Sequence, residues 1–243
     1  MIDLRINKTT HIGMVREVNE DSILTYENKD YTILIVADGM GGHNAGEIAS
    51  DIAVNTLNQY IESNFNIYDD YEDLLRDAIL EANKNIFKHS SESETLNGMG
   101  TTITALLVVK DGAYIAHVGD SRAYIVRDNA IRQITEDHSY INELLKKGAI
   151  TEEEASVHPM KNLITRAVGT DKYVVIDTFQ EAIHLNDYFI LCSDGLTRYV
   201  TESEILEFIF KGSSVDEIVE TANLRGGKDN ISLIVARKED IYE

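Results

Sequence analysis

Four apolar runs in this chain each meet an aspartate that has a glycine close beside it. The four places read VADGMGG at 36–42, HVGDS at 117–121, LCSDG at 191–195 and GGKDN at 226–230. Aspartate beside glycine is a common turn signal, so each case taken alone is explained as an isolated turn residue. The repetition constrains the fold more strongly, because it predicts several strands whose ends all carry a carboxylate.

Pairs of apolar runs joined by short polar turns predict antiparallel hairpins. The paired runs are 22–26 with 31–37, 102–109 with 113–118, and 123–127 with 130–134, and two further strands are predicted at 188–192 and 231–236. Apolar residues with a 3.6-residue period predict long helices at 47–61 and 71–87 and shorter ones at 140–147, 202–210 and 214–223. Hairpins with helix pairs between them favour antiparallel sheets covered by helices over a parallel, doubly wound sheet.

The composition narrows the class of protein. The net charge of −20, with no compensating basic stripe, argues against a nucleic-acid binder. A single cysteine excludes an internal disulfide and fits a reducing cytosol, and no apolar run approaches the ~18 residues of a membrane span. With one proline and no low-complexity linker, we expect residues 1–243 to form a single cytoplasmic domain that is monomeric and does not insert into membranes.

One polar stretch, about 137–169, differs from the rest of the chain. It carries little strand signal, contains three consecutive glutamates at 152–154, and lies between two blocks of predicted strands. We interpret it as a small flap beside the main body.

The predicted hairpins bring the aspartates together. Asp21 and Asp38 flank the open end of the first hairpin, and Asp120 follows the second. Asp194 ends a strand and Asp229 precedes one, so the two share an edge if those strands are antiparallel. Clustered carboxylates repel one another unless they protonate or bind cations, and oxygen-only ligands suit Mg²⁺ or Mn²⁺. The four recurring aspartates therefore favour a metal site over four unrelated turns.

Two other phosphate-handling motifs fit less well. Gly39-Met40-Gly41-Gly42 is rich in glycine but lacks the GxxxxGK spacing of a nucleotide-binding loop. Cys192 to Arg198 matches the C-x5-R spacing of cysteine-dependent phosphatases, yet Asp194 would stand inside the anion cradle. We interpret Cys192 as a buried strand residue and keep a Cys192-dependent phosphatase as a remote alternative.

Six ordered motifs resemble the metal-dependent serine/threonine protein phosphatases of type 2C, the PPM family, and specifically its compact bacterial branch. They extend over nearly the whole chain, from about residue 10 to residue 236. The motifs are Gly13-x-x-Arg16-x-x-Asn19-Glu20-Asp21, Val36-Ala37-Asp38-Gly39-Met40-Gly41-Gly42, Gly98-Met99-Gly100-Thr101-Thr102, Gly119-Asp120-Ser121-Arg122, Ser193-Asp194-Gly195-Leu196 and Gly227-x-Asp229-Asn230.

The resemblance implies an α+β fold in which two antiparallel sheets pack face to face with helices outside, a four-layer α-β-β-α sandwich. It also implies roles for site residues. Asp38 would bridge two Mn²⁺ or Mg²⁺ ions and the Gly39 carbonyl would bind one of them, while Asp194 and Asp229 would complete the other ion's ligands. Asp120, with Asp194, would hold a weaker third ion, Glu20 and Asp21 would act through water, and Arg16 would bind the substrate phosphate.

The activity implied is hydrolysis of phosphoserine and phosphothreonine in proteins by a hydroxide that bridges the metals. Two metals can activate such a water without any protein nucleophile. The partners implied are phosphoproteins and a bacterial Ser/Thr kinase that the enzyme opposes. Met40 stands where eukaryotic relatives carry a histidine proposed as the proton donor, so the general acid stays unassigned, with His11 and His43 as nearby candidates. A non-catalytic, metal-dependent binding module on the same fold is the alternative function.

Overall fold

The computed structural model describes residues 4–41, 45–92 and 94–239. Their elements, in chain order, are β1 (Leu4–His11), β2 (Asp21–Glu27), β3 (Tyr31–Met40), α1 (Ala45–Asn64), α2 (Tyr71–Ser90), the 3₁₀ turn η1 (Glu94–Leu96), β4 (Gly100–Thr101), β5 (Ile103–Val109), β6 (Gly112–Val118), β7 (Arg122–Arg127), β8 (Ala130–Gln133), α3 (Tyr140–Lys146), α4 (Glu152–Val157), β9 (Asp177–Glu181), β10 (Tyr188–Cys192), α5 (Asp194–Thr197), α6 (Glu202–Lys211), α7 (Val215–Leu224) and β11 (Ile231–Lys238).

The strands form two antiparallel sheets. One has the order β1-β11-β10-β7-β8 and the other β2-β3-β5-β6-β9, with the short β4 pairing β3. The three predicted hairpins are confirmed as β2–β3, β5–β6 and β7–β8. The first and last strands of the chain, β1 and β11, are also paired, from Leu4 opposite Lys238 to His11 opposite Ile231.

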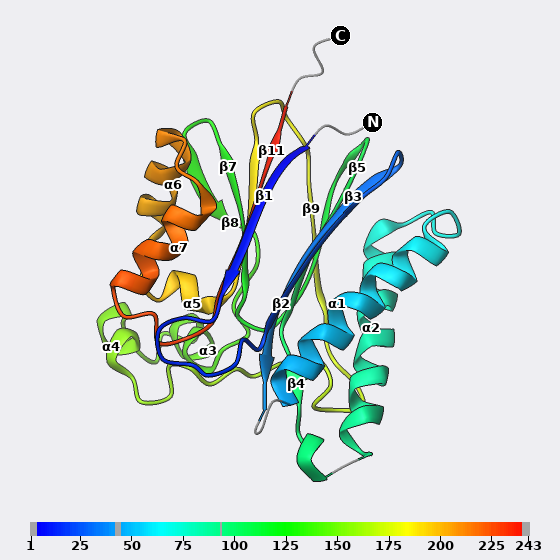
Figure 1. Cartoon of the computed structure of the whole chain (residues 1–243), viewed down its shortest axis with the longest axis horizontal. Helices are drawn as coiled ribbons and strands as arrows, with labels where there is room; N and C mark the ends of the chain where they lie inside the picture. Colours follow the sequence, from blue (N-terminus) through cyan, green and yellow to red (C-terminus); the bar gives the residue numbers. More distant parts are fainter. Residues whose placement is uncertain (1–3, 42–44, 93, 240–243) are drawn as a thin grey trace.

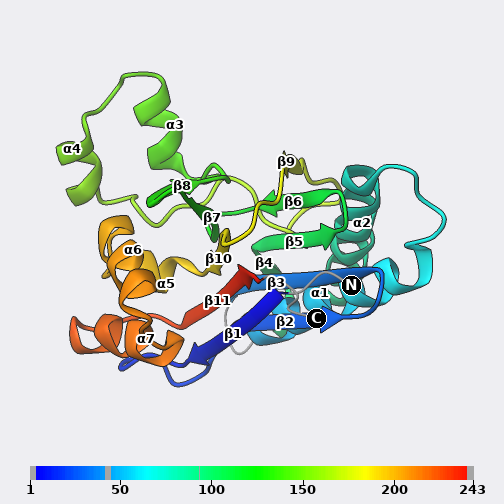
Figure 2. The same ribbon diagram turned by 90° about the horizontal axis from the view of Figure 1, so that it is seen from above.

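The two sheets face each other and helices cover their outer faces, as Figure 1 shows. Helices α1 and α2 lie on the six-stranded sheet, whereas α6 and α7 lie on the five-stranded sheet. The predicted four-layer α-β-β-α sandwich is therefore confirmed. Figure 2, seen from above, shows α3 and α4 standing apart from the four layers.

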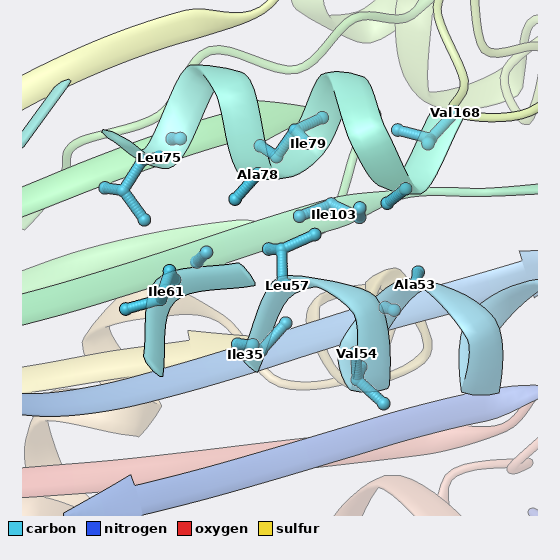
Figure 3. Close-up of a cluster of buried hydrophobic side chains, with 14 of the residues drawn as sticks. Ile35, Ala53, Val54, Leu57, Ile61, Leu75, Ala78, Ile79, Ile103 and Val168 are labelled. Atoms are coloured by element: carbon cyan, nitrogen blue, oxygen red, sulfur yellow. The ribbon is translucent and has the colours of Figure 1, made fainter. Parts of the chain in front are cut away.

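Alternation along β3 explains how one strand serves two cores. Ile33 and Ile35 pack against α1 and α2, whereas Leu34 and Val36 pack between the sheets. Figure 3 shows the helix side, where Leu57 of α1 and Ile79 of α2 meet near Ile35 and Ile103. Since side chains alternate along a strand, Asp38 follows Leu34 and Val36 on the face turned toward the other sheet.

The sequence missed several elements. It did not predict the edge strands β1 and β9, the short β4, or the short helices α4 and α5. Strand β1 buries Leu4 but leaves most of its other side chains partly or fully exposed, as an edge strand allows. Helix α4 lies in the polar stretch at 137–169, where no apolar period predicts it, although a capping box at Thr151 and Glu154 marks its start.

Candidate metal centre

The motif residues meet in a cleft of about 270 Å³ at one end of the sandwich. Its walls include Arg16, Glu20, Asp38, Gly39, Met40, Gly41, Thr102, Asp120, Asn162, Ile164, Asp194, Arg198 and Asp229. In Figure 1 this end is the lower one, where β3 ends and α5 begins. The fold therefore brings together, at this cleft, every site residue predicted from the sequence except Asp21, which lies below the cleft floor. Gly42 and His43 lie outside the described residues.

Asp38 forms the floor of the cleft, and Asp21 is its buried neighbour on β2. They stand directly opposite each other on β3 and β2, so their side chains share the face that looks into the gap between the sheets. The main chain of Asp38 is fixed, because its N–H donates to Thr102 Oγ1 at 2.9 Å and its carbonyl accepts from Thr101 Oγ1 at 3.0 Å. Among the described residues, no side chain donates a hydrogen bond to its carboxylate.

Asp21 is the more deeply buried of this pair, with 7% of its surface exposed. Its Oδ2 accepts a 2.8 Å hydrogen bond from Ser193, which ties β2 to the opposite sheet. Its Oδ1 is buried and has no partner among the described residues. A buried carboxylate oxygen without a donor is costly, so this atom is a candidate to bind water or a cation.

Gly39 lets three main-chain segments approach one another. A Cβ there would lie 2.1 Å from the carbonyl oxygen of Gly46 and 2.5 Å from that of Glu20. The Gly39 N–H donates to this same Glu20 oxygen at 3.0 Å. Any side chain at Gly39 would push the loops apart, so glycine is required at the position whose carbonyl was predicted to bind metal.

Asp194 and Asp229 lie on the five-stranded sheet's side of the cleft. Strands β10 and β11 are antiparallel, so the residues after β10 and before β11 share an edge, as predicted. Arg198 pairs with Asp194, one helical turn earlier on α5, and reaches Asp229 Oδ2 at 3.1 Å. In the sequence, Arg198 has a predicted role only in the C-x5-R motif, although its i,i+4 spacing from Asp194 is a signal for an ion pair.

The loop that carries Arg16 is held by Asn230, for which no role is predicted from the sequence. The side chain of Asn230 donates to the carbonyls of Ile12 and Val18, at 2.9 and 3.0 Å, and accepts from the Glu20 N–H at 2.8 Å. Asn230 thus positions the loop from three points. Arg16 pairs with Asp229 at 2.7 Å and lies 3.7 Å from Glu20, so its guanidinium reaches the cleft's edge.

Asp120 completes the cluster from the turn after β6. Ile103 at the start of β5 stands opposite Val118 at the end of β6, which places Asp120 beside the Thr102 that supports Asp38. Thr102 Oγ1 in turn lies 2.8 Å from Ser121 Oγ. A short hydrogen-bonded chain therefore links the turn of Asp120 to the main chain of Asp38.

The carboxylates of the cleft carry more negative charge than Arg16 and Arg198 neutralise. Burial, followed by repulsion from the neighbouring carboxylates, raises the pKa of Asp38 well above its usual value of 3.8. Burial also raises the pKa of Asp21 and of Asp120 to about 7. The pKa of Asp194 is raised by burial too, although the charge of Arg198 opposes that rise. These groups would lose their protons more readily beside added positive charge.

The donor set fits a hard divalent cation, because it consists of carboxylate and main-chain oxygens. The unpartnered Oδ1 of Asp21 and the raised pKa values of its neighbours also favour the binding of a cation. Within the described part of the chain, no three His, Cys, Asp or Glu side chains are already arranged around one point as a cage. Arg16 and Arg198 supply the positive charge that Asp194 and Asp229 contact here.

Cys192 is excluded from the cleft by the alternation of β10. It packs against α6 and α7 with Ile190, on the outer face of the sheet, while Leu191 faces inward. It is fully buried, and burial raises the pKa of its thiol to about 12. The prediction of a buried strand cysteine is confirmed, and a thiolate nucleophile is ruled out by both position and pKa.

The stretch at 137–169 contributes two cleft residues that the sequence did not single out, Asn162 and Ile164. It leaves and rejoins the sheets at one stem, where Ser139 bridges Ile164 and the Thr165 N–H donates to the His138 carbonyl at 2.7 Å. Between these points α3 and α4 project away from the layers (Figure 2). His11, one of the two histidines considered as a proton donor to the leaving group, does not line the cleft.

Comparisons with known proteins all find similarity to protein phosphatases. A family model described as protein phosphatase 2C matches residues 10–226. The serine/threonine phosphatase stp of Listeria welshimeri is 42% identical over 236 residues, which are 94% of this chain and 94% of that protein. The crystal structure of the serine/threonine phosphatase Stp1 from Staphylococcus aureus is 38% identical, with a TM-score of 0.89 over 99% of this chain and 96% of that one. The catalytic domain of the phosphatase PstP, in complex with two manganese ions, is 34% identical, with a TM-score of 0.86 over 98% and 99% of the two chains.

Proposed function

The chain belongs to the protein phosphatase 2C family and is a metal-dependent protein-serine/threonine phosphatase, and we propose that its acidic cleft works with two divalent cations. The ligands proposed are the Asp38 carboxylate between the two ions, the Gly39 carbonyl on one of them, and Asp194 and Asp229 on the other. The observation that carries this proposal is the meeting of more carboxylates than arginines at the end of the inter-sheet gap, where burial raises the pKa of Asp38 and of Asp194. The two manganese ions of the PstP structure support it.

We propose Mn²⁺ or Mg²⁺ as the ions, because both prefer oxygen ligands. When bound, such a pair supplies a water of lowered pKa and neutralises charge on the phosphoryl oxygens. No protein nucleophile is then needed, which agrees with the burial of Cys192 on the far face of β10.

Arg16 is proposed to bind the substrate phosphate. Its guanidinium lies at the edge of the cleft and contacts Asp229 at 2.7 Å, so it can turn between that carboxylate and an incoming anion. Two parallel N–H groups fit two phosphoryl oxygens, which an ammonium group cannot match. Asn230 holds the loop that presents Arg16, and Glu20 and the buried Asp21 are proposed to act through water.

Asp120 is proposed to hold a third, weaker ion together with Asp194. Both carboxylates line the cleft, and the negative charge of Asp194 adds to the effect of burial in raising the pKa of Asp120. Asn162 and Ile164 bring the flap at 137–169 to the same cleft, so this flap is proposed to contact the protein part of the substrate. The physiological partners proposed are phosphoproteins and an opposing Ser/Thr kinase, with the monomer in the cytoplasm as the active form.

The test is a comparison of turnover and ion binding in matched variants. The wild-type protein should hydrolyse p-nitrophenyl phosphate and a phosphothreonine peptide with Mn²⁺, lose both activities with EDTA, and regain them when Mn²⁺ is restored. Asp194→Asn should lose calorimetric binding of a tightly held ion, whereas Asp120→Asn should keep two tight ions and lose much of kcat. Turnover that survives chelation, or unchanged ion binding in Asp194→Asn, would contradict the metal assignment.

Arg16 needs a separate readout. Arg16→Lys should raise the inhibition constant of inorganic phosphate and lower kcat/KM, while ion binding by calorimetry stays unchanged. A variant with normal phosphate affinity would remove Arg16 from the substrate site without affecting the metal proposal.

A further inference from the structure

A second pocket, of about 290 Å³, lies at the opposite end of the five-stranded sheet from the metal cleft. The loop between α6 and α7 forms one wall and the paired strands β1 and β11 form the other. Arg237 is eight residues from Asp229 along β11, so the pocket is roughly 25 Å from the cleft at about 3.3 Å per residue. It is therefore separate from the proposed active site.

Two arginines stand side by side at this pocket. Arg5 on β1 and Arg237 on β11 are directly opposite each other in the antiparallel register, and both line the cavity. Like charges at opposite positions of an antiparallel pair are destabilising. An anion bound in the pocket that both arginines line would offset that repulsion.

The rest of the chain shows how unusual this pair is. Every other arginine contacts a carboxylate oxygen at 2.8 Å or less: Arg16, Arg76, Arg122, Arg127, Arg132, Arg166, Arg198 and Arg225. Among the described residues, Arg5 approaches only Glu239, at 4.0 Å, and Arg237 has no carboxylate partner. In a protein of net charge −20, two arginines without a close acidic partner at one cavity are a local site of positive potential.

Arg237 is held in place by neutral groups. Its Nη2 donates to Asn186 Oδ1 at 2.9 Å, and its guanidinium carbon lies 5.4 Å from the centre of the Tyr188 ring. Its Nε is buried and lacks a hydrogen-bond partner in the described part of the chain. A buried N–H of a charged group normally has an acceptor, so the hydrogen-bonding capacity of this guanidinium is only partly satisfied by the described residues.

The remainder of the pocket is largely apolar. Ile209, Val215, Ile218, Val235 and the Tyr188 ring line it, with Asn7, Ser213 and Ser214 as polar neighbours. No carboxylate lines it in the described residues. A cavity with an apolar floor and a few convergent polar groups is typical of small-molecule sites.

We propose that this pocket binds a small phosphoryl dianion that carries an apolar or aromatic body. The two guanidinium groups match the two negative charges and the oxygen geometry of a phosphoryl group, and the body packs on the isoleucine and valine floor. This site lies outside the catalytic cleft, so the ligand is neither substrate nor product of the phosphatase reaction there.

The experiment is ¹H–¹⁵N chemical-shift mapping of the magnesium-loaded protein with phenylphosphonate, which cannot be hydrolysed. Saturable shifts are expected at the amides of Ser213, Ser214 and Arg237, and binding at the catalytic cleft is followed separately through the amides of Asp38 and Gly39. Arg237→Gln should weaken binding at the pocket by about tenfold or more, since it removes charged hydrogen bonds. Arg5→Gln should have the same direction of effect.

Three controls complete the test. Arg132→Gln, an exposed arginine on β8 that pairs with Glu181, should bind phenylphosphonate at the pocket as the wild type does. Benzoate should bind more weakly and benzyl alcohol should not bind. No shifts at Ser213 and Ser214, equal binding by Arg237→Gln, or benzoate binding as tightly as phenylphosphonate would each overturn the proposal.

Discussion

Two buried carboxylates, Asp187 and Asp21, have opposite surroundings. Asp187 is 1% exposed and accepts hydrogen bonds from Arg127 Nε at 2.9 Å, from Arg127 Nη2 at 2.7 Å and from the His184 N–H at 2.7 Å. Asp21 is 7% exposed, accepts hydrogen bonds from neutral serine hydroxyls such as that of Ser193, and faces the carboxylate of Asp38 instead of a cation. The fold compensates the first charge fully and leaves the second without a counter-charge.

The difference teaches which acidic residues serve the fold and which serve the chemistry. An ion pair such as Asp187 with Arg127 fixes the turn before β10 to β7, and its loss would leave a buried charge. The group of Asp21, Asp38 and Asp120 costs stability until positive charge is added, which is the usual trade between stability and function at an active site.

The largest effect is expected for Asp38→Asn. Activity on p-nitrophenyl phosphate with Mn²⁺ should fall by on the order of 10³-fold, because the lost ligand removes several kcal/mol of transition-state stabilisation. The metal-free variant should unfold at the same or a higher denaturant concentration than metal-free wild type, since one repelling charge is gone. A variant that is both inactive and strongly destabilised would contradict the conclusion that Asp38 serves the chemistry and not the stability of the fold.

Asp187→Asn should show the reverse pattern. The buried charge of the pair would then lie on Arg127, which is partly exposed, and the free energy of unfolding should fall by about 2 kcal/mol. Below the unfolding transition, kcat with Mn²⁺ should stay within about twofold of wild type because the residue is far from the cleft. Urea unfolding and steady-state kinetics on one preparation separate the two quantities.

The pH dependence of the metal-free protein tests the same division without a mutation. Asp21 and Asp120 have pKa values raised to about 7, so between about pH 4 and pH 7 the folded state keeps protons that the unfolded chain has released. The stability from this protonation is complete below the unfolded pKa and is lost as the pH rises through 7. Lowering the pH from 7.5 to 5.5 in EDTA should therefore raise Tm by several degrees, at about 2–4 °C per kcal/mol.

Saturating Mg²⁺ is the control for this measurement, because bound cations keep carboxylates ionised and should flatten the dependence of Tm on pH. An equally steep rise of Tm on acidification with and without Mg²⁺ would show that the stabilising protons bind elsewhere.

The smallest effect is expected for Cys192→Ala. Like Asp21, this residue is a buried ionisable group that forms no ion pair in the described part of the chain. Burial raises the pKa of its thiol to about 12, so the thiol stays neutral and contributes to the packing of the fold. The substitution should cost about 1 kcal/mol of stability through lost packing against α6 and α7 and leave kcat unchanged. A folded but inactive variant would revive the C-x5-R mechanism.

The sequence predicted the central strands and long helices because their apolar periods are strong, and it predicted the acidic cluster because hairpin geometry alone brings strand ends together. It could not predict β9, where Phe179 stands among polar residues, since pairing with β6 decides that strand. It also missed Asn162, Ile164 and the positioning role of Asn230. These residues reach the cleft through tertiary contacts with segments distant in the sequence, which no local pattern records.

The pairing of β1 with β11 has a consequence for biosynthesis. The Glu20 main chain is held by the side chain of Asn230, 210 residues later in the sequence, and Thr10 meets Ser232 across the same strand pair. A chain emerging from the ribosome can form the β2–β3 and β5–β6 hairpins early, because their contacts are local. The loop that carries Arg16 receives its support only when the final strand arrives. A partly synthesised chain that still lacks β11 should therefore be unable to remove phosphate from other proteins, and activity should appear in a single step once β11 is present.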